Sequence, residues 1–266
     1  MKFTVHDTFS AMADLLERPL EERPALLTAM LAPMRASIPM PGDSVDLHHM
    51  GSGFRVDRED ERYLPAVRNL IDRDVRGRIE RALADAADRL RSFDGPDHLN
   101  VMFVLGDPDD DYLMDVAGGY YGMGSYGDWL YVIAWPREDV IDRIAHCAVH
   151  EFHHNVRFRN VEWNPETVTV GEHVVAEGLA EAFVREMSGP GAMDCPPATQ
   201  FFPPSTHPTR RTQAPPTAFP AASPRAQRIR STSPGSKKTT DIYKTIMLRE
   251  PPRMPEPQEY TGQGDT

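Results

Sequence analysis

Cysteine is scarce in this chain of 266 residues, which has only Cys147 and Cys195. This excludes a disulfide-rich scaffold and favours a reducing compartment. Long apolar runs are also missing: no segment reaches the length of a membrane span, and the N-terminus has no apolar core of signal-peptide length. We therefore expect a cytoplasmic protein that has no membrane partner.

Basic residues are few in the first 186 residues, which contain 19 Lys and Arg but 34 Asp and Glu. A nucleic-acid partner would need a basic stripe, and this segment has none, so that class of function is excluded. The last 80 residues contain 15 of the 25 prolines and show almost no hydrophobic periodicity. Composition therefore predicts three parts: an N-terminal helical segment 1–58, a folded domain 59–188 and a Pro-rich, disordered tail 189–266.

Hydrophobic periodicity predicts the secondary structure of the folded part. Helices are expected at 7–36, 61–93, 137–157 and 171–187, and strands at 99–105 and 129–135. A loop is expected over 40–58 and a flexible, glycine-rich turn over 118–127. Within that turn, Gly122–Gly127 match G-x-G-x-x-G but precede a strand instead of opening a helix, which excludes a dinucleotide site. The order of elements indicates an α+β fold with a small antiparallel or mixed sheet.

The most specific motif is HEFHH, which begins at His150. On a helix it places His150 and His154 one turn apart on one face, so that both imidazoles reach a single Zn²⁺. Glu151 is the expected general base, taking a proton from a water that the metal activates and passing it to the leaving amine. His146 and His150 have the same spacing, but only the later pair has a glutamate directly after its first histidine. The other member of the motif, His153, is expected to be half-buried or on the surface.

A third ligand is expected on the helix that follows. Glu177 lies 23 residues after His154, and a carboxylate on a second helix packed across the first would complete a His₂Glu site. Glu181, one turn further on, is the alternative ligand, or it supports a ligand imidazole through its other ring nitrogen. We favour Glu177 because Gly178 and Ala180 beside it allow the helices to approach closely. The substrate is expected to lie extended beside the strand 129–135.

The pairing of HEFHHNVR with AEGLAEAFVRE resembles the YjaZ-like family of predicted Zn-dependent proteases, whose members combine an HEYHH-type helix with an EGLAE helix. The resemblance covers about residues 60–187. It implies a zincin-like fold of the gluzincin kind, with the sheet packed on the HExxH helix and on a second, ligand-bearing helix. It also implies a Zn²⁺ cofactor held by His150, His154 and Glu177, with Glu151 as general base and a peptide or protein as substrate.

The chain departs from the family after the EGLAE helix. Family members continue with another folded segment, whereas this chain continues with a proline-rich sequence. This sequence looks like an out-of-frame translation of a GC-rich gene. The alternative is a genuine disordered tail. The main hypothesis is a zinc-dependent peptidase. The alternative is a truncated, catalytically silent zinc-binding domain that acts through partner contacts.

Overall fold

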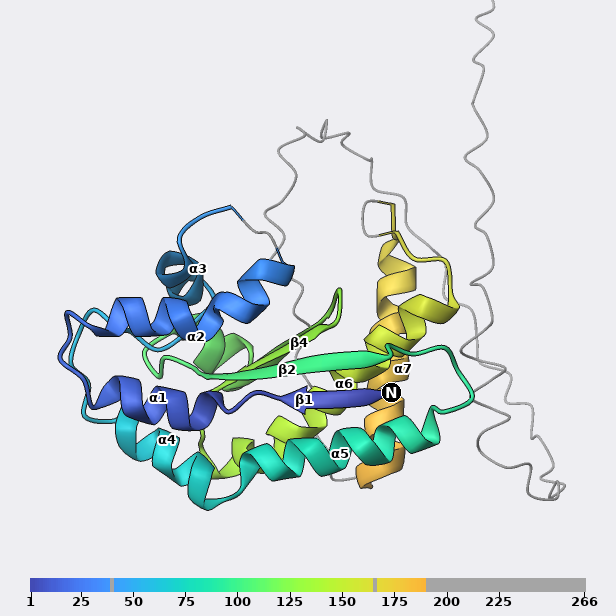
Figure 1. Ribbon diagram of the computed structural model, residues 1–266. Coiled ribbons are helices and arrows are strands. Elements are labelled where there is room, and N and C mark those ends of the chain that lie inside the picture. Colours follow the sequence, from blue (N-terminus) through green and yellow to red (C-terminus); the bar gives the residue numbers. More distant parts are fainter. Residues whose placement is uncertain (39–40, 165–166, 190–266) are drawn as a thin grey trace, which may run out of the picture.

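The computed structural model describes residues 1–38, 41–164 and 167–189. The predicted tail lies outside the described residues from residue 190 onward. A four-stranded sheet with the order β1-β2-β4-β3 organises the described part (Figure 1). Its strands are β1 (Lys2–Val5), β2 (His98–Leu105), β3 (Tyr120–Tyr126) and β4 (Trp129–Ala134). The strands β1, β2 and β4 are parallel and β3 is antiparallel to β4, so the predicted α+β class with a small mixed sheet is confirmed.

The two strands expected from the sequence are the central strands of this sheet. Every residue of β4 is buried, as are the last five residues of β2. A strand covered on both faces has apolar residues in succession instead of alternation, which is why LNVMFVL and WLYVIA could be recognised as strands. β1 was missed, because its four residues at the chain end are too few to show a pattern.

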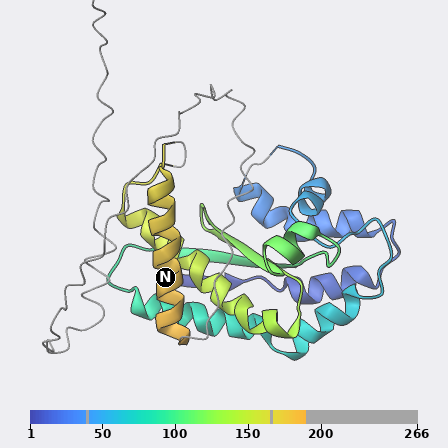
Figure 2. The ribbon, with the colours of Figure 1, turned by 180° about the vertical axis from the view of Figure 1, so that it is seen from behind.

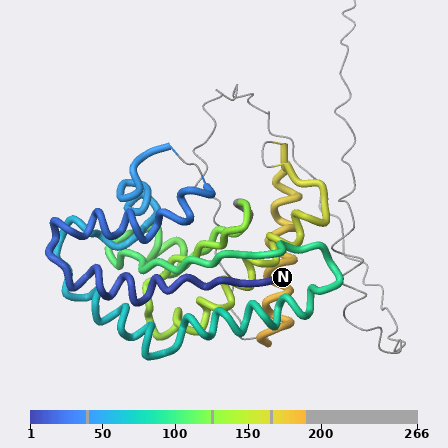
Figure 3. Tube along the Cα trace, in the orientation of Figure 1, coloured from blue at the N-terminus to red at the C-terminus, as the bar shows by residue number. Residues whose placement is uncertain are grey.

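The helices cover both faces of the sheet (Figures 1 and 2), and their order along the chain can be followed in the tube of Figure 3. They are α1 (Thr8–Leu16), α2 (Arg23–Ser37), α3 (Ser44–Met50), α4 (Tyr63–Asp72), α5 (Val75–Arg89), the π-helical turn η1 (Tyr112–Val116), α6 (Glu138–Asn160) and α7 (Val170–Ser188). The helices α2 and α3 lie on one side of the sheet and α5 and α6 on the other. In the described ranges, no helix combines the length and the apolar character that crossing a bilayer requires.

Three expectations about local structure were wrong. The helical pattern of 61–93 forms two helices, α4 and α5, because Asp74 takes a left-handed conformation with φ of 48° and turns the chain between them. The loop expected over 40–58 contains α3, which begins where Asp43 accepts hydrogen bonds from the first backbone amides of the helix. The expected glycine-rich turn contains β3, since pairing with the buried β4 extends its backbone despite the glycines.

Candidate metal centre

The candidate centre lies where α7 crosses α6. α6 packs along the sheet against β3 and β4, and most of its second half is buried, including His150 and His154. α7 begins at a capping box, in which the Thr169 side chain accepts from the Glu172 amide and the Glu172 carboxylate accepts from the Thr169 amide. The start of α7 is thereby fixed, and its third turn brings the half-buried Glu177 into contact with the two histidines.

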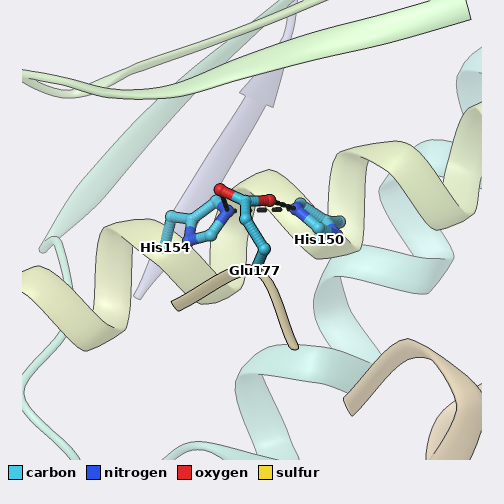
Figure 4. A group of neighbouring side chains, drawn as sticks. All are labelled: His150, His154 and Glu177. Carbon is cyan, nitrogen blue, oxygen red and sulfur yellow. Dashed lines mark hydrogen bonds and ion pairs between the residues drawn. The ribbon is translucent and has the colours of Figure 1, made fainter. Parts of the chain in front are cut away.

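Three side chains converge there (Figure 4). His150 Nε2 and His154 Nε2 are 3.0 Å apart. The Glu177 carboxylate spans them, with Oε2 at 3.0 Å from His150 Nε2 and Oε1 at 3.4 Å from His154 Nε2. Each residue offers one ligand atom, and these atoms all lie within 4.8 Å of one another. Among the described residues this is the one group of its kind.

The donor set fits a divalent cation. His150 Nδ1 lies 2.9 Å from Glu181 Oε1, a contact that places the proton of a neutral imidazole on Nδ1. His150 Nε2 then presents a lone pair to another imidazole nitrogen and to a carboxylate, and a cation between these groups removes their mutual repulsion. Two imidazoles and one carboxylate are a set that Zn²⁺ takes in catalytic sites, with a further position left for water.

Burial and hydrogen bonding set the charges of the two central glutamates. Burial raises the pKa of Glu177, but the close contacts and charge interactions of its carboxylate with the two imidazoles outweigh burial and hold that pKa well below its ordinary value. Glu177 is therefore an anion, as a metal ligand must be. Burial raises the pKa of Glu151, and the nearby Glu177 adds to the rise, while the two histidines and a hydrogen bond from the Gly124 amide oppose it.

Glu151 lies between α6 and β3, where two glycines make room for it. A Cβ on Gly122 would stand 2.4 Å from Glu151 Cγ, and a Cβ on Gly124 would stand 2.4 Å from the Glu151 carbonyl oxygen. The pairing of β3 with β4 is irregular between Met123 and Tyr126, and within this stretch the Gly124 amide turns to the Glu151 carboxylate. The glycines of the segment 118–127 were the sequence signal for the close packing of β3 on α6. We interpreted this segment only as a flexible turn.

The neighbouring histidines take no part in the group. His146 is half-buried and lies outside the three-residue cluster. His153 was expected to be half-buried or on the surface, which is wrong: its side chain is 0% exposed, and its ring lies 5.4 Å from the ring of Phe183 on α7. It is buried because α7 covers this face of α6. Neither of its ring nitrogens has a hydrogen-bond partner in the described part of the chain.

The strand expected to bind substrate was also wrongly chosen. β4, which occupies 129–134, is paired on one side with β2 and on the other with β3. Both of its edges are used, so it has no free backbone groups for a peptide. The strand that packs on α6 and ends the sheet at this side is β3, which among the described residues pairs with β4 alone.

Comparison with known proteins finds a family model that matches the part of the chain containing this centre. Residues 77–195 match the family described as predicted Zn-dependent protease (DUF2268). Over these residues the chain is similar to the predicted proteases of that family. The resemblance expected from the HEFHH and EGLAE helices is thereby confirmed, and His150, His154 and Glu177 all lie within the matched residues.

One curated relative is the uncharacterized protein YjfC of Bacillus subtilis (strain 168). It is 30% identical over 175 residues, which cover 65% of this chain and 56% of the relative. The chain therefore spans little more than half the length of this relative. No solved structure matches the chain.

Proposed function

We propose that this chain is a zinc-dependent peptidase with a zincin-like active site of the gluzincin kind. The observation that carries the proposal is the convergence of His150, His154 and Glu177 beside a buried Glu151. The description of the matching family as predicted Zn-dependent proteases supports it. We propose the cytoplasm as its location and a peptide or protein as its substrate, with no role for nucleic acid or membrane.

In this proposal His150, His154 and Glu177 hold the metal and Glu181 fixes the tautomer of His150. Zinc bound there would make a nearby water more acidic and polarise the carbonyl of the scissile amide. The three ligands come from two helices: α6 packs against the sheet, and α7, which begins at a capping box, packs against α6. Such support keeps the ligands in place with little loss of entropy when the metal arrives.

Glu151 is the proposed general base. In the metal-free chain burial raises the pKa of Glu151, and a carboxylate of higher pKa is a stronger base toward water. It would accept a proton from the attacking water and later donate that proton to the amine nitrogen of the departing peptide. The Gly124 amide holds the carboxylate against β3, on the side of α6 that faces the sheet.

We place the substrate along β3. The outer backbone groups of a strand at the edge of a sheet can pair with an extended peptide, which provides affinity without regard to side chains. β3 contacts α6 at Glu151, so a peptide paired with β3 would run past the proposed base.

The test has two parts, metal content and cleavage. The purified chain is expected to bind about one zinc per chain and to cleave a peptide library. Glu151→Gln is expected to retain zinc and to lose cleavage, while the matched change Glu162→Gln, at an exposed glutamate beyond α6, is expected to retain both.

Each of the other outcomes has a definite meaning. Cleavage by the Glu151→Gln variant would contradict the role of this residue. Stoichiometric zinc without cleavage of any peptide would favour the alternative, a silent zinc-binding domain that acts through partner contacts. An absence of zinc binding would overturn both.

A further inference from the structure

The two ligand histidines are supported in different ways. His150 has a hydrogen-bond partner on α7, because its Nδ1 lies 2.9 Å from Glu181 Oε1. His154 is also buried, at 5% exposed, but its Nδ1 has no hydrogen-bond partner among the described residues. A ligand imidazole in a zinc site is usually oriented by a hydrogen bond at its second nitrogen. Outside the centre, the ring of His154 is in contact with an aromatic ring instead.

An aromatic stack lies against His154. The ring of Phe158 is nearly parallel to that of His154, with a centroid distance of 5.4 Å and an interplanar angle of 12°. The ring of Trp163 lies on Phe158 at 4.1 Å and 18°. His173 closes the series with an edge contact to Trp163 at 5.2 Å and 86°. Offset parallel and edge contacts of this kind are the arrangements that aromatic rings prefer.

The stack joins three parts of the chain around one ligand. Phe158 is one helical turn after His154 on α6, so its ring naturally covers the same face. Trp163 comes from the segment that follows α6, and His173 comes from the first turn of α7. Phe158 is thus held between the ligand on one side and the returning chain on the other, and the His154 ring has little freedom to rotate about its Cβ–Cγ bond.

We propose that Phe158, backed by Trp163, is a positioning residue that orients the ligand ring of His154 in place of a hydrogen bond. The inference rests on the zinc site of the proposed function but not on peptide cleavage. The inference predicts that zinc affinity falls when the aromatic ring at position 158 is removed. Removal of a group that orients a ligand typically weakens metal binding by about 10–100-fold.

The experiment measures zinc affinity of the full chain by competition with a chromophoric chelator. Phe158→Leu keeps an apolar side chain and removes the ring, and we expect it to bind zinc about tenfold more weakly. Phe158→Tyr keeps the ring and is expected to bind zinc within about twofold of the original chain. Trp163→Leu removes the backing ring and is expected to weaken binding by a smaller factor.

The matched control is Phe183→Leu. Phe183 is 3% exposed, lies on α7 and packs against His153, which is not a ligand. This change removes a ring from the same helix pair that is more deeply buried than the half-buried Phe158, so it is expected to lower the melting temperature of the metal-free chain at least as much as Phe158→Leu does, while leaving zinc affinity nearly unchanged. The comparison separates loss of packing from loss of ligand orientation.

The outcomes distinguish this inference from the function on which it rests. If the unaltered chain binds no zinc, the proposed function fails first. If it binds zinc and Phe158→Leu binds equally well, or if Phe183→Leu weakens binding as much, the positioning role is overturned. Should Phe158→Leu fail to fold, unchanged zinc affinity of Trp163→Leu would overturn it.

Discussion

Gly124 on β3 lies directly against the backbone of Glu151 on α6, where an added Cβ would stand 2.4 Å from the Glu151 carbonyl oxygen. Real Cβ atoms essentially never approach another atom so closely, and the obstructing atom is helix backbone that cannot rotate away. The glycine therefore sets the distance between the edge of the sheet and the proposed base. The Gly124 amide also donates a hydrogen bond to the Glu151 carboxylate. Gly124 therefore leaves room for the Glu151 backbone and also fixes the position of its side chain.

Replacement of this glycine by alanine tests that relationship. We expect Gly124→Ala to lower the free energy of unfolding by about 1–3 kcal/mol, because overpacking forces neighbouring backbone to shift. Gly178→Ala is the contrast: nothing lies within 4 Å of its Cβ position. At that helical site alanine should raise stability by about 0.5–1 kcal/mol. Urea denaturation of the metal-free variants measures both, and equal effects of the two changes would contradict the close packing at Gly124.

The contact of Glu181 with His150 leads to a prediction about metal affinity. Glu181→Gln keeps the size of the side chain and an acceptor oxygen but removes the negative charge that favours a proton on Nδ1. We expect zinc to bind about tenfold more weakly, at the lower end of the range for outer groups around a metal. Glu177→Gln, which removes a proposed ligand, should weaken binding much more. Calorimetric titration with zinc measures both, and an effect of Glu181→Gln as large as that of Glu177→Gln would indicate that Glu181 is itself a ligand.

The parts of the centre that depend on helix geometry could be predicted from the sequence. The spacing of His150 and His154 fixes their relative position once α6 forms. Of the two small residues expected to allow a close helix crossing, Ala180 is buried, but the expectation was wrong for Gly178, because nothing lies within 4 Å of its Cβ position. The surroundings of Glu151 could not be predicted, because they depend on where β3 lies. Strand order is set by contacts between distant segments such as β1 and β2, and no local pattern encodes it.

The break between α4 and α5 shows a second limit of local patterns. Both helices have the same hydrophobic period, so the sequence looks like one helix, and the interruption rests on the conformation of a single residue. Asp74 has φ of 48°, and its carboxylate accepts a hydrogen bond from the Gly77 amide at 3.2 Å. Aspartate tolerates this left-handed conformation better than most residues do, and it is also a favourable helix cap.

Two substitutions at Asp74 separate these roles. Asp74→Ala loses the cap and keeps an unfavourable positive φ, so we expect a loss of about 1–2 kcal/mol in the free energy of unfolding. Asp74→Gly also loses the cap, but glycine adopts positive φ freely, and the expected loss is only a few tenths of a kcal/mol. Thermal or urea denaturation measures the difference. If the alanine variant were as stable as the glycine variant, the conformation at this position would not be what interrupts the helix.

The last prediction concerns acid stability and His48 on α3. Burial, with His49 and Arg55 nearby, lowers the pKa of His48 from its ordinary 6.5 to about 3, although the contact of its Nε2 with the Phe54 carbonyl oxygen at 2.8 Å opposes the shift. Between these two values the unfolded chain binds a proton at this site and the folded chain does not. Stability should therefore fall as the pH falls below 6.5, by about 1.4 kcal/mol for each pH unit from this residue alone.

The slope of stability against pH isolates that contribution. His48→Gln is expected to be less stable at pH 7, since a buried ring is lost, but its free energy of unfolding should fall less steeply between pH 6.5 and 4.5. His98→Gln, at an exposed histidine on β2, should keep the slope of the original chain. Urea denaturation at a series of pH values measures these slopes. Parallel slopes for the original chain and His48→Gln would show that Nδ1 of His48 accepts its proton in the folded state, which would contradict the lowered pKa of this residue.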